Sequence, residues 1–298
     1  MRHASRRARV LMSRLSSSFA VTTVHLADDR ITQVDTRAGI VPGEETLEVR
    51  LDGAVLATVA RTPGHDIDLA HGLLFSRGLI RRAGDVDTAR YCAGADATGT
   101  NAYNRLDLSL TRRPQLAFAP TTAAANPEPG SGRGSDCAAS PSAAAPIAQL
   151  QAELELHQTN TKRAYSVDPL LIGATIVGLH KGRRLFHKTG GTHAAAACDE
   201  EGNPVVLRED ITAGNCVPQV VGALLLDAKL PASKLVLALS YTPDFATIRL
   251  AALVGFSAVI SAEVPSSQAV DAARAAGIVL VGRASEQDFS LYAGELRP

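Results

Sequence analysis

The chain has 298 residues, hydrophobic residues make up 46% of them, and 30 Lys and Arg balance 30 Asp and Glu. This length allows one large domain or two ordinary ones, and the balanced charge argues against partners such as nucleic acid or an acidic membrane. A disulfide framework is not expected, because the four cysteines are too few and too scattered: Cys92, Cys137, Cys198 and Cys216. We also find no secretory signal before them. The longest apolar stretch, 250–262, is too short to span a bilayer. We therefore expect a cytoplasmic protein with reduced thiols.

The first 18 residues are basic and rich in Ser, which is typical of a disordered arm or of a transit peptide. A strand-like segment follows at 19–26. Residues 45–63 predict a hairpin, because Asp52-Gly53 separates two apolar runs and both turn residues need positive φ. Residues 63–80 then predict a helix that begins at His65 or Asp66 and ends at Gly78, and residues 104–111 alternate like another strand.

Residues 120–146 have the Ala, Ser, Gly and Pro composition of a flexible linker. A helical pattern resumes after them, and two short helices are expected before Gly190-Gly191. The rest alternates between apolar runs and amphipathic segments. We predict strands at 204–210, 234–240, 257–262 and 278–282, with helices at 218–228, 244–255 and 266–277.

These elements predict four regions: a disordered arm (1–18), an α+β N-terminal domain (19–119), a flexible loop that carries Cys137 (120–146) and an α/β C-terminal domain (147–298). Strands without polar alternation, separated by helices, indicate a largely parallel sheet covered by helices on both faces. Ligands settle at the carboxyl ends of such strands. The segment 209–216 leads directly into a helix N-terminus, which favours an anion such as a phosphate.

No His pair at i,i+4 and no C-x-x-C is present, so we expect no metal site. Cys198 and Cys216 are typical of packing residues, although a helix N-terminus beside Cys216 would lower the pKa of its thiol. Cys137 differs, because the residues around it cannot bury it, and the bare sequence weighs evenly for and against a functional role.

Three blocks of the chain make it recognisable: LEVRLDGAVLATVARTPGHDIDLAHGLLFSRGLI, KTGGTHAAAACDEEGNPVVLRED and AVISAEVPSSQAVDAARAAGIVLVG. They resemble the FdhD/NarQ family of sulfur carrier proteins required for formate dehydrogenase activity, over residues 19 to 295. The resemblance implies a cytidine-deaminase-like three-layer fold with an added N-terminal domain, and a homodimer. The H-x-E and P-C-x-x-C signatures of the deaminases are not in this sequence, so zinc-dependent deamination is not implied.

The resemblance also implies a function. Such a protein accepts sulfur as a persulfide from a cysteine desulfurase (IscS-like) and delivers it to the molybdenum cofactor, Mo-bis(molybdopterin guanine dinucleotide), for formate dehydrogenase or a related molybdoenzyme. Cys137 takes the place of the first cysteine in the family's C-G-x-C-G loop. The cofactor-binding residues implied by the resemblance are His193, Asp210, Asn215, Arg283, Ala284, Ser285, Glu286, Gln287 and Asp288.

Several positions depart from the family pattern. Ser140 replaces the second loop cysteine, Thr212–Gly214 and Tyr241–Asp244 lack the family's basic residues, and Asp288 stands in the place of a cation. Each lost cation removes charge-assisted hydrogen bonds worth about 1.5–3 kcal/mol, although Arg249 and Arg283 lie where they could compensate.

Three functional hypotheses follow. The first is a sulfur carrier, a sulfurtransferase-type accessory protein, with Cys137 as the persulfide carrier. The second is a divergent paralogue that binds the molybdenum cofactor or a guanine nucleotide as a chaperone or partner subunit, without sulfur transfer. The third is an unrelated enzyme on a deaminase-like scaffold, for which the sequence offers no motif.

Overall fold

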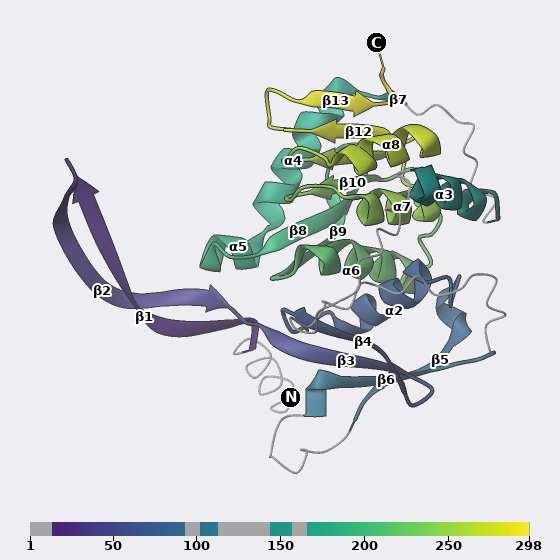
Figure 1. Cartoon of the computed structure of the whole chain (residues 1–298), viewed down its shortest axis with the longest axis horizontal. Helices are drawn as coiled ribbons and strands as arrows, with labels where there is room; N and C mark the ends of the chain where they lie inside the picture. Colours follow the sequence, from purple (N-terminus) through teal and green to yellow (C-terminus); the bar gives the residue numbers. More distant parts are fainter. Residues whose placement is uncertain (1–13, 93–101, 113–143, 157–165, 298) are drawn as a thin grey trace, which may run out of the picture.

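The computed structural model describes residues 14–92, 102–112, 144–156 and 166–297 (Figure 1). Its N-terminal half holds a two-stranded arm and a four-stranded sheet of order β4-β3-β6-β5 with helix α2 packed nearby. The bounds are β1 Ser16–Ala27, β2 Arg30–Pro42, β3 Glu45–Leu51, β4 Ala54–Arg61, α2 Asp66–Ser76, β5 Val86–Tyr91 and β6 Arg105–Leu110, with short 3₁₀ turns at Ala83–Asp85 and Ala102–Asn104.

The C-terminal half is built on a six-stranded sheet of order β13-β12-β11-β10-β8-β9. Its strands are β8 His193–Cys198, β9 Pro204–Asp210, β10 Val236–Leu239, β11 Ala258–Ser261, β12 Val279–Gly282 and β13 Ser290–Ala293. The helices are α3 Ala144–Leu156, α4 Pro169–Gly182, α5 Arg184–Thr189, α6 Ala213–Leu226, α7 Phe245–Val254 and α8 Ser267–Ala276, and a small ladder joins β7 Ser166–Val167 to β14 Glu295–Leu296.

The sequence prediction of a largely parallel sheet is wrong. Only β10, β11 and β12 run parallel to one another, and β8, β9 and β13 are antiparallel to their neighbours. The reason lies in connection length: β8 and β9 are joined by the short segment 199–203, and a parallel pair needs a crossover of a dozen residues or more. The sheet is therefore mixed, with a parallel centre.

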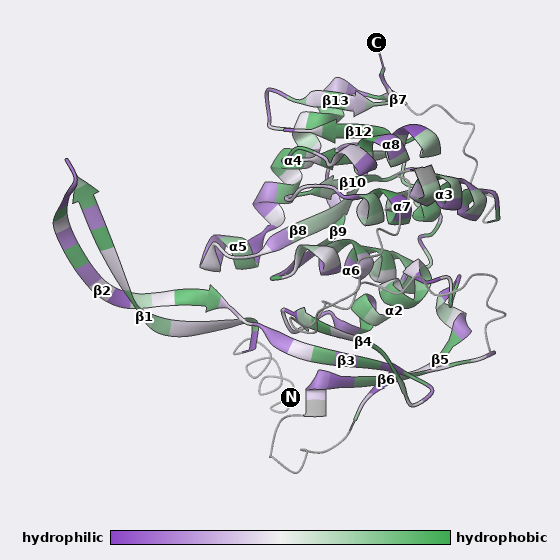
Figure 2. Ribbon diagram, in the orientation of Figure 1, coloured by the Kyte–Doolittle hydropathy of each residue, from purple (hydrophilic) through white to green (hydrophobic). Residues whose placement is uncertain are grey.

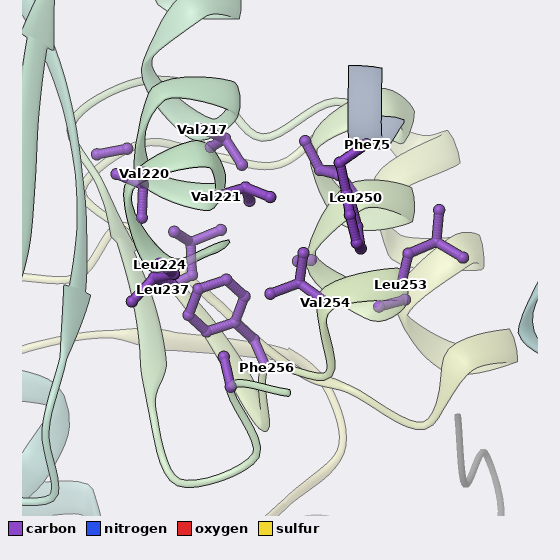
Figure 3. Close-up of a cluster of buried hydrophobic side chains, with 14 of the residues drawn as sticks. Phe75, Val217, Val220, Val221, Leu224, Leu237, Leu250, Leu253, Val254 and Phe256 are labelled. Carbon is purple, nitrogen blue, oxygen red and sulfur yellow. The ribbon is translucent and has the colours of Figure 1, made fainter. Parts of the chain in front are cut away.

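Helices cover both faces of this sheet (Figure 1). The side chains of β8 alternate between two hydrophobic clusters. Ala195 and Ala197 belong to the cluster on the α6, α7 and α8 side, whereas Ala194, Ala196 and Cys198 pack with α4. Figure 3 shows part of the first cluster, to which both Phe75 of α2 and Leu250 of α7 belong. The small alanines let both helical layers approach the sheet closely.

The two halves touch through helices α2 and α6. A Cβ built at Gly72 would lie 1.9 Å from the carbonyl oxygen of Pro218, and one at Gly222 would lie 1.8 Å from that of Asp68. Only glycine permits this backbone approach. The interface also joins Arg208 of β9 to Asp68, with the guanidinium 2.8 Å from the carboxylate.

Most predicted turns and helix ends are confirmed. Asp52 and Gly53 both have positive φ in the β3–β4 turn, and Ser266 and Gly277 bound α8. The helix predicted at 218–228 begins earlier, at Ala213, so Pro218 lies inside α6 rather than in its first turn. Strand β1 begins at Ser16, within the predicted arm 1–18. Within the described ranges, no helix is both long enough and apolar enough to cross a membrane.

Candidate functional site

One edge of the C-terminal sheet collects the ends of five strands. Strands β10, β11 and β12 finish there, and the antiparallel neighbours place the start of β8 and the end of β9 at the same edge. Helices α6, α7 and α8 begin just beyond it. Asp244 and Ser266 cap α7 and α8 with their own side chains, whereas Thr212 makes no such bond at α6. The first turn of α6 therefore keeps backbone N–H groups available for an anion.

His193, Asp210 and Asn215 meet at this edge, as the sequence predicts. His193 and Asp210 are register partners on β8 and β9. The Asp210 carboxylate is fully buried and accepts three hydrogen bonds, from the backbone N–H of Thr212 (2.8 Å), Asn215 Nδ2 (3.1 Å) and Gln219 Nε2 (2.7 Å). Asp210 is thus an internal anchor for the start of α6.

The N-terminal domain holds the same turn from the other side. The carbonyl oxygen of Ala60, in β4, accepts hydrogen bonds from Asn215 Nδ2 (2.8 Å) and from Thr212 Oγ1 (3.0 Å). The hydroxyl of Thr62 accepts one from the backbone N–H of Ile211 (3.1 Å). The N-terminal half of the chain therefore positions the α6 N-terminus, and Asn215 joins the two halves rather than facing solvent.

Burial shifts the pKa values of Asp210 and His193 at this edge. It raises the pKa of Asp210 to about 6, because an ionised carboxylate is costly away from water and its hydrogen bonds offset only part of that cost. Burial and the nearby Arg183 guanidinium both lower the pKa of His193. Its ring lies 5.8 Å from that of Tyr241, edge to face. His193 is therefore held as a neutral imidazole at pH 7.

A second network shapes the loop before His193. The Glu209 carboxylate accepts hydrogen bonds from the backbone N–H groups of Leu185 and Phe186 (2.8 and 2.7 Å) and from the hydroxyl of Thr192 (2.8 Å). The buried Arg183 donates to the Thr192 carbonyl oxygen (2.6 Å) and stacks on Phe186. Glu209 and Arg183 thus fix the Thr-Gly-Gly-Thr loop, and sequence reasoning missed both.

The predicted residues Arg283 to Asp288 lie beyond the end of β12 at the same edge. Arg283 has φ 51°, and the Ser285 hydroxyl accepts hydrogen bonds from the backbone N–H groups of Gln287 and Asp288. Ala284 is buried, and its N–H bonds to the Ser261 carbonyl. Three strands separate β12 from β9, so this loop lies about 19 Å from Asp210 at the usual strand spacing. The predicted residues form two groups along one edge.

Arg249 does not compensate for the basic residues of the family pattern that this chain lacks. Arg249, on α7, donates to Glu153 of α3 (2.6 Å) and to the carbonyl oxygen of Ser76 (3.1 Å), at the contact between the helices. The proposed compensation by Arg249 is therefore wrong. Arg283 remains exposed at the edge.

The Arg-Thr-Pro-Gly-His-Asp motif is structural. The buried Arg61 binds Asp66 through two hydrogen bonds of 2.8 and 3.0 Å. Arg61 also donates to Asn104, and the Tyr91 hydroxyl donates to Asp66. Burial and this carboxylate raise the pKa of Tyr91. The motif closes the junction between β4 and α2.

The cysteines divide by accessibility. Cys198 and Cys216 are buried, and burial raises the pKa of Cys198 to about 12 and that of Cys216 well above its usual range. The expectation that the helix N-terminus lowers the pKa of Cys216 is wrong, because burial outweighs the dipole. Cys92 is half-buried and donates to Asp107 (2.6 Å). Cys137 and Ser140 lie outside the described residues. Within the part of the chain that the structure describes, no three His, Cys, Asp or Glu side chains lie close enough together to bind a metal ion.

Gln219 was also missed, although the sequence contains a signal for it. Gln219 follows Asn215 by four residues, so both project from one face of α6 toward the preceding strand end. An amide pair at that spacing, just after Glu209 and Asp210, is a pattern that could have been used.

The fold is that of a mixed α/β protein with a candidate site where the strands of the C-terminal sheet end. Residues of the N-terminal half position this site. The chain belongs to the FdhD/NarQ family, whose sequence profile matches residues 42–298. It is 34% identical to "Sulfur carrier protein FdhD" of Corynebacterium efficiens over 96% of this chain and 100% of that one. It is 35% identical to the protein of the same name from Streptomyces avermitilis, over 89% and 90% of the two chains.

One solved structure gives the same fold. It is described as a formate dehydrogenase accessory protein from Desulfotalea psychrophila. It superposes with a TM-score of 0.65 over 93% of this chain and 97% of that one, at 16% sequence identity.

Proposed function

We propose that this protein is a sulfur carrier that passes persulfide sulfur from a cysteine desulfurase to the molybdenum cofactor, for the maturation of formate dehydrogenase. The observation that carries the proposal is the family match over residues 42–298. It is joined by relatives named sulfur carrier protein, which this chain matches over almost their whole length. The Desulfotalea psychrophila protein, of the same fold, adds the link to formate dehydrogenase.

Cys137 is the proposed carrier. Its thiolate attacks the terminal sulfur of the desulfurase persulfide, a new S–S bond forms on Cys137, and the desulfurase cysteine leaves as a thiolate. No general base is named, because the thiolate form of Cys137 is the attacking group and transfers no proton in this step. Two of the other cysteines support this assignment by exclusion, since Cys198 and Cys216 are buried and their raised pKa values keep them protonated.

The molybdenum cofactor is a substrate in this proposal, and the strand-end edge is where it would bind. The uncapped first turn of α6 suits a phosphate. The second group, Arg283 to Asp288, lies about 19 Å along the edge at the usual strand spacing. Only an elongated ligand reaches both groups, which favours a dinucleotide over a mononucleotide. His193, held neutral, would donate or accept one hydrogen bond there.

The test is intact-mass analysis of the full chain after incubation with a cysteine desulfurase and cysteine. Wild type and Cys92→Ala should gain the mass of a sulfur atom, and Cys137→Ala should not. Cys92→Ala is the matched control because it removes the half-buried thiol of the N-terminal sheet. Equal loading of Cys137→Ala and wild type, or no loading of wild type, would overturn the carrier role.

The alternative is a paralogue that binds the cofactor or a guanine nucleotide without transferring sulfur. Two observations favour it: Ser140 stands where the family pattern has a second cysteine, and the loop after β12 carries the exposed acids Glu286 and Asp288. Its prediction is binding of GDP by a chain that takes up no sulfur, which isothermal titration calorimetry would measure.

Four finer points stay predictions: the likeness to cytidine deaminases, the division into domains at 120–146, the cytoplasmic location and the homodimer.

A further inference from the structure

The corner where helix α4 leads into α5 concentrates positive charge. Residues 169–198 contain no Asp or Glu, and their Lys and Arg residues are Lys181, Arg183, Arg184 and Lys188. The whole chain balances 30 basic against 30 acidic residues, so this excess is local. Figure 2 shows hydrophilic residues where α4 ends beside α5.

The two helices meet at Arg183, which ends α4 and begins α5 (Figure 1). Nε2 of the His187 ring lies 2.8 Å from the carbonyl oxygen of His180, so α5 is held against the end of α4. The polar side chains of this turn are therefore neighbours on one surface. We call the exposed ones the basic corner: His180, Lys181, Arg184, His187 and Lys188.

The cations of the basic corner have no acidic partner within the described part of the chain. Lys181, Arg184 and Lys188 form no ion pair there, and Lys188 donates to the hydroxyl of Ser16. Glu209 contacts α5, but its carboxylate is occupied by two backbone N–H groups of that helix and by a threonine hydroxyl. Unpaired surface cations of this kind attract an anionic partner.

The basic corner adjoins the strand-end edge. The buried Arg183 guanidinium donates to the Thr192 carbonyl oxygen (2.6 Å), and the next residue, His193, begins β8 at that edge. A protein that docks on the corner therefore lies next to the place where the cofactor would bind. In the proposed function the acceptor enzyme must approach this edge, because it takes the cofactor from it, whereas the desulfurase needs to reach only Cys137.

We propose that the basic corner is the docking surface for the acceptor enzyme, which meets it with an acidic face beside the entrance to its own cofactor site. This inference rests on the proposed function and names the surface where its acceptor binds. Charges at the rim of an interface speed association and fix orientation more than they add affinity. Such a contact suits a carrier, which must release the enzyme after delivery. Nucleic acid fits less well, because the chain as a whole is neutral.

Two pairs of charge-removing substitutions form a matched test. Lys181→Gln with Arg184→Gln removes two charges from the basic corner. Lys229→Gln with Lys234→Gln removes two charges between α6 and β10, at the opposite edge of the sheet, so the two variants have equal net charge. All four side chains are exposed, so circular dichroism should be unchanged in both variants.

The measurement is surface plasmon resonance of the full chain with apo-formate dehydrogenase, prepared without its cofactor. At about 50 mM salt the corner variant should associate at least about fivefold more slowly than wild type, and the control variant as fast as wild type. At about 300 mM salt, where surface charges are screened, the three should converge. Each single substitution in the corner should show part of the effect.

Four results would overturn the proposal. The first two are a wild type that does not bind the apo-enzyme, and corner and control variants that associate equally fast at low salt. The third is a corner variant that loads sulfur more slowly yet binds the enzyme normally, which would assign the corner to the desulfurase. The fourth is loss of inorganic pyrophosphate binding with enzyme association unchanged, which would assign it to phosphates. Sulfur loading is read by mass, so the carrier function and this contact can fail separately.

Discussion

Replacing Gly222 by alanine tests the contact between α2 and α6 directly. The new Cβ would lie 1.8 Å from the Asp68 carbonyl oxygen and 2.6 Å from its carbonyl carbon. Gly214, in the same helix, is the control, because a Cβ there meets nothing within 4 Å. Neither glycine has the positive φ that would strain an alanine.

The expected magnitude follows from two opposing effects. Alanine gains up to about 1 kcal/mol of helix propensity over glycine at either position. At 222 the methyl group meets backbone, which cannot rotate away, so the two helices must separate by more than about 1 Å. Overpacking of this kind costs about 1–3 kcal/mol and occasionally more. We expect Gly222→Ala to lose about 2 kcal/mol and Gly214→Ala to gain up to about 1 kcal/mol.

Urea unfolding followed by circular dichroism measures the difference. Gly222→Ala should move the midpoint to lower urea without changing the slope, and lower Tm by about 3 °C for a chain of this size. A Gly222→Ala protein as stable as Gly214→Ala would refute the close approach of the two helices.

Three further outcomes follow. Asp66→Asn should cost about 3 kcal/mol in chemical denaturation, because it removes the nearer of the two carboxylates that neutralise the fully buried Arg61 guanidinium and leaves only Glu45, 3.6 Å away. The pKa of Asp210 is raised to about 6, so its carboxyl group stays protonated to higher pH in the native state than in the unfolded chain. The stability of wild type relative to Asp210→Asn should therefore fall by about 2 kcal/mol as pH rises from 4 to 6, and level off above about pH 7. Iodoacetamide at pH 8 should leave Cys198 and Cys216 unmodified in the native protein, as peptide mass analysis would reveal.

Each of these outcomes has a control or a contrary result. Asp227→Asn breaks the exposed pair with Lys229 and should cost less than about 1 kcal/mol. A stability difference that does not vary between pH 4 and 6 would mean that Asp210 ionises normally in the folded protein. Alkylation of Cys216 at the rate of the unfolded chain would contradict its burial.

Local signals in the sequence predicted local structure well. The Asp52-Gly53 turn and the Ser266 cap were found because each depends on one or two residues whose backbone or side-chain chemistry is distinctive. His193, Asp210 and Asn215 were correctly grouped, since strand ends and the helix that follows are neighbours along the chain or across one hairpin.

Features that depend on strand order were not predicted. Nothing local in the sequence places β8 between β10 and β9, so the separation of Arg283–Asp288 from Asp210 was not foreseen. The alanines of β8 give no strand signal, because alanine has low β-propensity and the strand is defined by the helices on either side. Arg183 and Glu209 were missed because their partners are mostly backbone groups, the Thr192 carbonyl oxygen for Arg183 and two N–H groups at the start of α5 for Glu209.

The glycine contact between α2 and α6 has a consequence for proteolysis. The composition of the chain suggests that it divides at 120–146, yet α2, from before that segment, packs into the hydrophobic cluster formed after it. Ala60 and Thr62 add hydrogen bonds across the same junction. A single cut between residues 113 and 143 should therefore yield two fragments that co-purify and unfold together, and neither gene fragment expressed alone should give a stable fold.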